Sequence, residues 1–120
     1  MNNFRKLIVW QKSIELVKLI YTLSKSLPVE EKYNLKSQMV RCAVSIPSNI
    51  AEGCSRSGKK DFKRFLEIAL GSTFELETQL IITESLYFDN NKLKNIFNKN
   101  NEIQKILNTL ITKFKKEIDG

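Results

Sequence analysis

Histidine is absent from this 120-residue chain, and glycine, proline and cysteine are scarce, with 4, 2 and 2 residues respectively. Without histidine the sequence offers no Ser-His-Asp or Cys-His nucleophile, no Glu-x-x-His di-iron site and no histidine-bound zinc. The glycines show neither the GxGxxG nor the GxxxxGK[ST] spacing of phosphate-binding loops. We therefore expect a protein that is not an enzyme, holds no metal or cofactor and has no evident small-molecule substrate.

The two cysteines, Cys42 and Cys54, fall in one expected helix. Their spacing corresponds to about 18 Å along a helix axis, which is too far for a disulfide. Unpaired cysteines are typical of a reducing compartment. Cys54 has no histidine to activate it, so we do not expect it to act as a nucleophile.

Long apolar runs are also missing, because none approaches the ~18–20 residues of a membrane span. The first residues, MNNFRKLIVWQKS, lack the basic start, long apolar region and cleavage site of a signal peptide. These absences predict a cytoplasmic protein with no membrane partner.

The net charge of +7 is unevenly distributed along the chain. Residues 1–64 hold 13 Lys and Arg against 5 Asp and Glu, whereas residues 65–91 hold 5 acids and no base. Residues 92–120 are basic again, with 7 bases and 3 acids. A basic molecule with one acidic stretch favours anionic partners that contact a defined face, and nucleic acid is the first such candidate.

Apolar residues recur at helical spacing through most of the chain, interrupted by a few turn residues. The pattern predicts four helices over about residues 5–26, 28–57, 59–88 and 92–118. Short turns between long helices predict an all-α, up-down-up-down antiparallel four-helix bundle that forms one domain over residues 1–120. We expect Pro47 to kink the second helix; the alternative is two short helices broken at Ser45–Ser48.

The second helix has more apolar surface than one core needs. At 100° per residue, one stripe contains Leu35, Met39, Cys42, Ile46, Ile50 and Gly53. A second stripe lies about 120° away by the same geometry and contains Val40, Val44, Pro47 and Ala51. In so short a chain, we expect another copy of the protein to cover this second stripe, so it is the predicted oligomer interface.

A basic cluster lies at the start of the third helix and just before it. Its members are Arg56, Lys59, Lys60, Lys63 and Arg64. Cations there oppose the helix dipole, and their like-charge spacing is mildly destabilising, which makes sense if phosphates bind. This is the predicted nucleic-acid site; the alternative is a solvated lysine-rich turn.

Some polar residues are expected to lie inside the bundle. Glu77 and Glu84 fall on the apolar stripe of the third helix, and we expect a polar core contact, for example with Asn49, in which Glu52 also takes part. A carboxylate metal site is disfavoured without histidine. Trp10 and Tyr21 share the core stripe of the first helix, and the Asn-rich segment 95–101 has poor helix propensity and is expected to fray.

Two motifs resemble a known family. The first contains Pro28, Glu31, Leu35, Gln38, Arg41, Ser45, Pro47, Asn49–Gly53 and Arg56. The second contains Phe65, Leu66, Ala69, Gly71, Ser72, Glu75, Glu77 and Leu80. Together with Trp10 and Ser13, they resemble the four-helix-bundle family encoded in intervening sequences of bacterial large-subunit ribosomal RNA genes. The resemblance covers about residues 5–88, and Cys54-Ser55 departs from it, because the family often has an aromatic residue and a glycine there.

The resemblance implies a small bacterial bundle that assembles as a ring, typically a homopentamer. A related branch serves diversity-generating retroelements as an accessory protein whose basic rings bind nucleic acid. From residues and resemblance together we expect a non-enzymatic homo-oligomer that binds nucleic acid, RNA in preference, through basic patches. The alternative is a protein-interaction adaptor ring with no direct nucleic-acid role.

Overall fold

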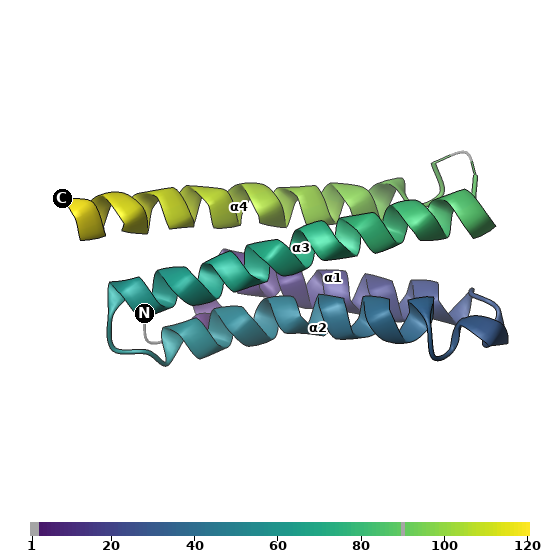
Figure 1. Cartoon of the computed structure of the whole chain (residues 1–120), viewed down its shortest axis with the longest axis horizontal. Coiled ribbons are helices and arrows are strands. Elements are labelled where there is room, and N and C mark those ends of the chain that lie inside the picture. The colour runs from purple at the N-terminus through teal and green to yellow at the C-terminus, as the bar shows by residue number, and fades with distance from the viewer. Residues whose placement is uncertain (1–2, 90) are drawn as a thin grey trace.

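The computed structural model describes residues 3–89 and 91–120; Met1, Asn2 and Asn90, the middle of the turn expected at 89–91, lie outside it. Four long helices dominate the described part: α1 (Ile8–Lys25), α2 (Leu35–Cys54), α3 (Lys59–Tyr87) and α4 (Lys94–Asp119). Two single 3-10 turns, η1 (Phe4–Lys6) and η2 (Val29–Glu31), precede α1 and α2. The helices run alternately in opposite directions, and α1 also packs on α4 (Figure 1). The predicted all-α four-helix bundle is confirmed.

The second helix begins later than the sequence predicted. The chain between Pro28 and Asn34 forms η2 and a turn, and α2 begins only at Leu35. Asn34 has φ −114° and ψ −107°, which is outside the helical region. The last connection uses Asn91 at φ 61°, a left-handed conformation that asparagine tolerates better than most residues.

Helix α2 continues through Pro47, so the alternative of two short helices is wrong. Proline removes one backbone N–H donor, yet side chains supply nearby hydrogen bonds. The Ser48 hydroxyl donates to the carbonyl of Val44 at 2.8 Å, and the Asn49 amide donates to the carbonyl of Ser45 at 2.8 Å. A bend of the helix axis at Pro47 stays a prediction.

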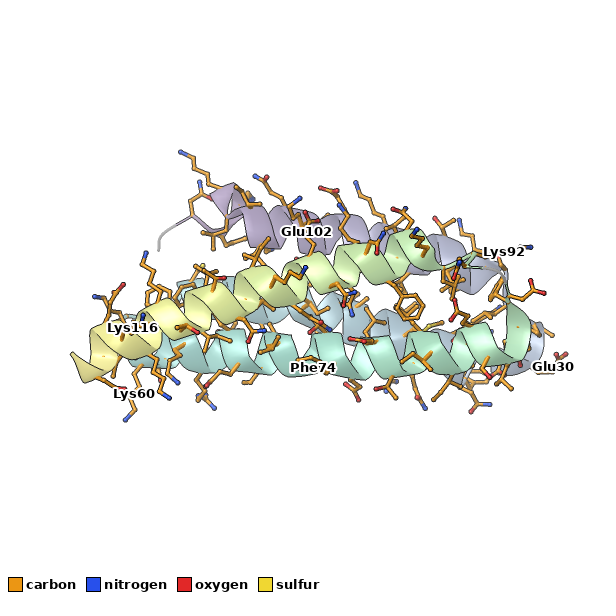
Figure 2. The ribbon with its side chains drawn as sticks, turned by 90° about the horizontal axis from the view of Figure 1, so that it is seen from above. Glu30, Lys60, Phe74, Lys92, Glu102 and Lys116 are labelled. Atoms are coloured by element: carbon orange, nitrogen blue, oxygen red, sulfur yellow. The ribbon has the colours of Figure 1, made fainter. Side chains whose placement is uncertain are left out.

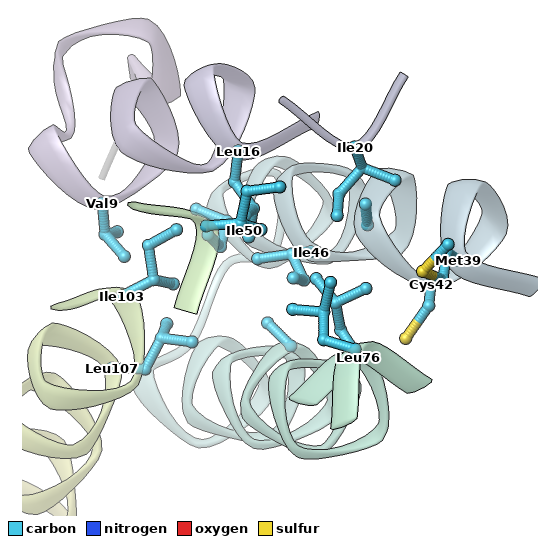
Figure 3. Packing of buried hydrophobic residues seen from close by; sticks show 14 of the residues in the cluster. Val9, Leu16, Ile20, Met39, Cys42, Ile46, Ile50, Leu76, Ile103 and Leu107 are labelled. Carbon is cyan, nitrogen blue, oxygen red and sulfur yellow. The ribbon is translucent and has the colours of Figure 1, made fainter. Parts of the chain in front are cut away.

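One cluster of apolar side chains from all four helices fills the bundle (Figure 3). Its completely buried members include Leu16, Ile46, Leu76 and Leu107. The first stripe of the second helix belongs to this core, as predicted, with Leu35 at its edge. Such burial of apolar area is the main force that holds the helices together.

Two sequence expectations were wrong. Tyr21, expected on the core stripe of the first helix, is 49% exposed. Tyr87 also lies at the surface, where its hydroxyl donates to Glu31. A phenol at a helix flank can cover apolar neighbours and keep its hydroxyl in water. The Asn-rich segment does not fray, because it is a regular part of α4 and Asn100 is completely buried. The amide of Asn100 donates to the carbonyl of Thr73 at 2.9 Å, so tertiary contact outweighs helix propensity.

Candidate nucleic-acid and assembly surfaces

The residues of the predicted basic cluster lie together at the surface, but three of them already have acidic partners. Lys59 pairs with Glu117 of α4 at 2.7 Å. Within α3, Lys63 pairs with Glu67 at 3.1 Å, and Arg56, just after the end of α2, pairs with Glu52 at 3.1 Å. All of these pairs are partly exposed, so they are weak and leave the cations reachable.

The other two bases of the cluster, Lys60 and Arg64, form no ion pair with a described acidic side chain, and the two arginines of the cluster also contact an aromatic ring. The guanidinium groups of Arg56 and Arg64 lie 4.9 and 5.1 Å from the centre of the Phe65 ring. Cation–π contacts of this kind orient a guanidinium and leave its N–H groups free to bind an anion. Lys60 is exposed, and no acidic side chain of the described residues pairs with it.

The fold adds bases that the sequence reasoning missed. The rings of Phe62 and Phe114 are in edge contact, with centroids 5.0 Å apart, and this contact holds the end of α4 beside the start of α3. Lys116 thereby comes to the same end of the bundle as Lys60 (Figure 2), and Lys113 and Lys115 lie beside it in the last turns of α4. The antiparallel topology was the signal that could have found them, because the end of the fourth helix must lie near the start of the third.

The N-terminal turn η1 completes this surface, since it packs against α2. We call the surface the basic end. Its members are Arg5, Lys6, Arg56, Lys59, Lys60, Lys63, Arg64, Lys113, Lys115 and Lys116. Five acids accompany these ten bases, namely Glu52, Asp61, Glu67, Glu117 and Asp119. The basic end therefore carries a net charge of +5, most of the excess charge of the molecule.

A hollow of about 600 Å³ lies along the C-terminal half of α4, inside the basic end. Thr109, Thr112, Lys113 and Lys116 line it together with Asn108 and Glu117. Hydroxyl, amide and ammonium groups of this kind are the usual donors to phosphate and sugar oxygens. The hollow is open and lined by α4 alone, so it adds polar groups to the basic end without enclosing a ligand.

The second apolar stripe of α2, which was predicted to be covered by another copy, lies partly against α1 of the same copy. Val44, Pro47 and Ala51 line an apolar groove of about 330 Å³ together with Ser48 and four side chains from η1 and α1, which are Phe4, Trp10, Ile14 and Val17. Pro47 is buried at this groove, Val40 and Ala51 are half-buried, and Val44 is 38% exposed. We call it the α1–α2 groove. Trp10 is packed against the core, as expected.

Another apolar surface was not predicted. Five large apolar side chains of α3 are 41–62% exposed, and we call them the α3 face: Ile68, Phe74, Ile81, Ile82 and Leu86. Phe74 lies midway along the helix (Figure 2). A helical-wheel count over residues 59–88, beyond the core stripe alone, would have shown this second apolar arc.

Several polar residues of the two motifs meet in a groove of about 350 Å³ between α2 and α3. The Ser45 hydroxyl donates to the Ser72 hydroxyl at 2.6 Å, and the Cys42 thiol donates to the carbonyl of Ser72 at 3.0 Å and to Glu75 at 3.4 Å. Gln38, Arg41 and Asn49 also line it. These bonds join the two helices, so the polar residues of the motifs have a structural role here.

The prediction that Glu77 and Glu84 would contact Asn49 and Glu52 inside the bundle was wrong. Glu77 accepts a hydrogen bond from Gln104 of α4 at 2.8 Å, whereas Asn49 bonds within its own helix. Glu52 is exposed and pairs with Arg56, and Glu84 is half-buried. The sequence could not show that an amide on the fourth helix would reach Glu77.

Residues 3–89 and 91–120 show neither a metal-binding cluster nor a membrane-spanning helix. No three Cys, Asp or Glu side chains there gather so that they could hold a metal ion. No helix in that part of the chain is long and apolar enough to cross a membrane.

The fold and its surfaces define a class: long antiparallel bundles with one basic end and apolar surface left open. The chain belongs to the 23S rRNA-intervening sequence protein family, whose profile matches residues 5–109. It is also similar to a solved structure from Bacteroides thetaiotaomicron, described as a protein of unknown function from the S23 ribosomal protein family. The two are 32% identical with a TM-score of 0.78, over 87% of this chain and 98% of that one. No curated protein matches the chain. The resemblance inferred from the motifs is confirmed.

Proposed function

We propose that this protein is a non-enzymatic homo-oligomer that binds nucleic acid through its basic end. We expect the oligomer to be a pentameric ring and the nucleic acid to be RNA in preference to DNA. One observation carries the proposal: η1, the connection between α2 and α3, α3 and α4 all bring bases to the same end of the bundle, with ten bases against five acids. A solvated surface has no need for such clustering, since like charges repel. Phosphates would relieve that repulsion.

Recognition should depend on the backbone and not on base sequence. The basic end offers lysines, arginines and hydroxyls, which contact phosphate and sugar oxygens, and the sequence shows no base-reading motif. A ring would bring several basic ends together, so that weak contacts of each copy add up to firm binding.

The test is a variant in which Lys60, Arg64, Lys115 and Lys116 are each changed to Gln; none of these four bases forms an ion pair with a described side chain. A matched control changes Lys25, Lys92, Lys94 and Lys105 to Gln, which alters the net charge equally but away from the basic end. Binding of a labelled mixed-sequence RNA is followed by fluorescence anisotropy. We expect the first variant to lose about tenfold or more in affinity near 0.1 M salt, because each lost phosphate contact lowers counterion release.

The control should bind within about twofold of the unchanged protein, since surface charge alone has a small, screened effect. Equal losses in both variants would show that only net charge matters, and the basic end would not be the site. If the unchanged protein does not bind RNA or DNA, the proposal fails. A protein partner retained after nuclease treatment would then favour the adaptor alternative.

A further inference from the structure

We propose that the α3 face of one copy docks into the α1–α2 groove of a second copy, so that the chain assembles head to tail. This inference rests on the self-assembly part of the proposed function and names the two surfaces that meet. It replaces the expectation that the second stripe of α2 would form the interface alone.

The α3 face has the composition of a buried surface but lies in water. Phe74 and Ile81 are 52% and 53% exposed, and Leu86 is 62% exposed. From Ile68 to Leu86 the face runs about 27 Å along the helix. Large apolar side chains exposed together along one helix mark an interaction site and are unusual on a monomer.

Gly71, in the middle of the same face, points to a close neighbour that the protomer itself lacks. A Cβ built at Gly71 would meet no atom within 4 Å, so nothing in the described bundle requires a glycine there. Glycine costs about 1 kcal/mol relative to alanine inside a helix. The approach of another helix to this position would account for the residue.

The α1–α2 groove offers the complementary shape. Its lining is almost entirely apolar, and about 330 Å³ is room for an aromatic side chain such as Phe74. Trp10 and Val44 form opposite walls from α1 and α2. A helix that lays its apolar face into a groove between two helices is a recurrent mode of protein recognition.

Charge selects a second copy of this chain as the occupant. Residues 65–91, which contain the α3 face, hold five acids and no base. On the other side, residues 5–25 hold five bases and one acid, and residues 35–51 hold two bases and no acid. Lys18 and Lys25 of α1 are exposed in these segments. The acidic α3 of one copy and the basic pair of α1 and α2 of another copy therefore attract each other, which favours a second copy of this chain as the binding partner.

Because the two surfaces differ, the contact is heterologous. Each copy then offers one free α3 face and one free groove, and the chain closes into a ring when the rotation between copies permits. An isologous dimer would instead use the same surface twice.

This difference gives a sharp experiment. One variant carries Phe74→Asp and Ile81→Asp on the α3 face, and the other carries Val44→Asp in the groove. Light scattering at micromolar concentration should show that each alone is a monomer. Mixed 1:1, they should form a dimer and nothing larger, because the first keeps an intact groove and the second keeps an intact α3 face.

The control is Val29→Asp, which changes an apolar residue that is 72% exposed and belongs to neither surface; it should assemble like the unchanged chain. Circular dichroism checks folding, and the milder pair Phe74→Ser and Ile81→Ser replaces the α3 variant if that one unfolds. Assembly of either variant alone, or a mixture that stays monomeric, would overturn the inference. An unchanged chain that is itself monomeric would overturn it together with self-assembly, whereas RNA binding, measured separately on the basic end, could still hold.

Discussion

The pKa and the accessibility of a cysteine thiol depend on its surroundings, as the two cysteines show. Burial, followed by the hydrogen bond to Glu75, raises the pKa of the Cys42 thiol to about 12. Burial also raises the pKa of Cys54, but that residue is only half-buried and lies at the last turn of α2. The thiolate is the reactive form, so both thiols should be slow nucleophiles at neutral pH.

We expect iodoacetamide to label Cys54 before Cys42 in the folded protein. The physical reason is that Cys42 is packed against α3 and keeps its proton, whereas Cys54 is reachable near the surface. Peptide mass spectrometry after timed labelling at pH 8 measures the order, and the same labelling in urea is the control, where the two should react alike. Faster labelling of Cys42 in the folded state would show that the contact of α2 with α3 opens readily.

At the scale of helices, the closest approach is between α2 and α3, and Gly53 permits it. A Cβ at Gly53 would lie 2.8 Å from Cδ1 of Phe62 and 2.9 Å from Cβ of Phe65. Phe65 cannot move its Cβ without moving the helix, so α3 itself would have to shift. Gly53 therefore lets the end of α2 pack closely against the start of α3, where several bases of the basic end lie.

Gly53→Ala should destabilise the bundle by about 1–3 kcal/mol, because overpacking outweighs the gain in helix propensity. Gly71→Ala is the matched control: it is also inside a helix but has open space, and it should stabilise by up to ~1 kcal/mol. Both are measured by urea unfolding in the Phe74→Asp, Ile81→Asp background, which keeps copies apart. Equal effects of the two changes would contradict the close approach at Gly53.

The contact of α3 with α4 is tied at the basic end by Lys59 and Glu117. The hydrogen bond from Lys59 is the main cause that lowers the pKa of Glu117. Because the folded pKa lies below its ordinary value, the pair contributes stability at neutral pH, and this contribution is lost as the pH falls through the folded pKa. The groups are exposed, so the effect on stability is small.

Lys59→Gln should raise the pKa of Glu117 toward its ordinary value of 4.5. Carboxylate NMR titration measures the shift residue by residue. Lys60→Gln, one residue along and without an ion pair among the described side chains, should leave it unchanged. A pKa of Glu117 that does not respond to loss of Lys59 would show that the end of α4 is not held against α3 in solution.

Across the whole molecule, charge and apolar surface are separated: the bases gather at one end, and the acidic, apolar α3 face lies along the side. Binding through phosphates releases counterions and is strongly salt-dependent, whereas docking of apolar surfaces is much less so. The two activities of the proposal should therefore respond differently to ionic strength.

We expect RNA affinity to fall at least tenfold between about 50 and 200 mM salt while the assembled mass changes little, because apolar burial dominates the docking. Anisotropy and light scattering on the same samples measure both. If assembly dissolved in parallel with RNA binding, the charges and not the apolar residues would hold the copies together.

Much of the fold followed from residue pattern, because helical periodicity and turn residues are local properties. The number of helices, the core stripe of Met39, Ile46 and Ile50, and the family were predicted, and the described structure and comparisons confirmed them. The exposure of Tyr21, the start of α2 and the partner of Glu77 were not, since each depends on a neighbour distant in sequence.

The amino-acid sequence by itself determined four long amphipathic helices, a chain without the groups for common enzyme chemistry, and an excess of bases near the start of the third helix. Only the tertiary structure decided that Lys113 to Lys116 join those bases, that Pro47 lies at an apolar groove with Trp10, and that α3 keeps an apolar face open. The reason is physical: periodicity fixes which residues share a side of one helix, but what each side meets depends on how all four pack.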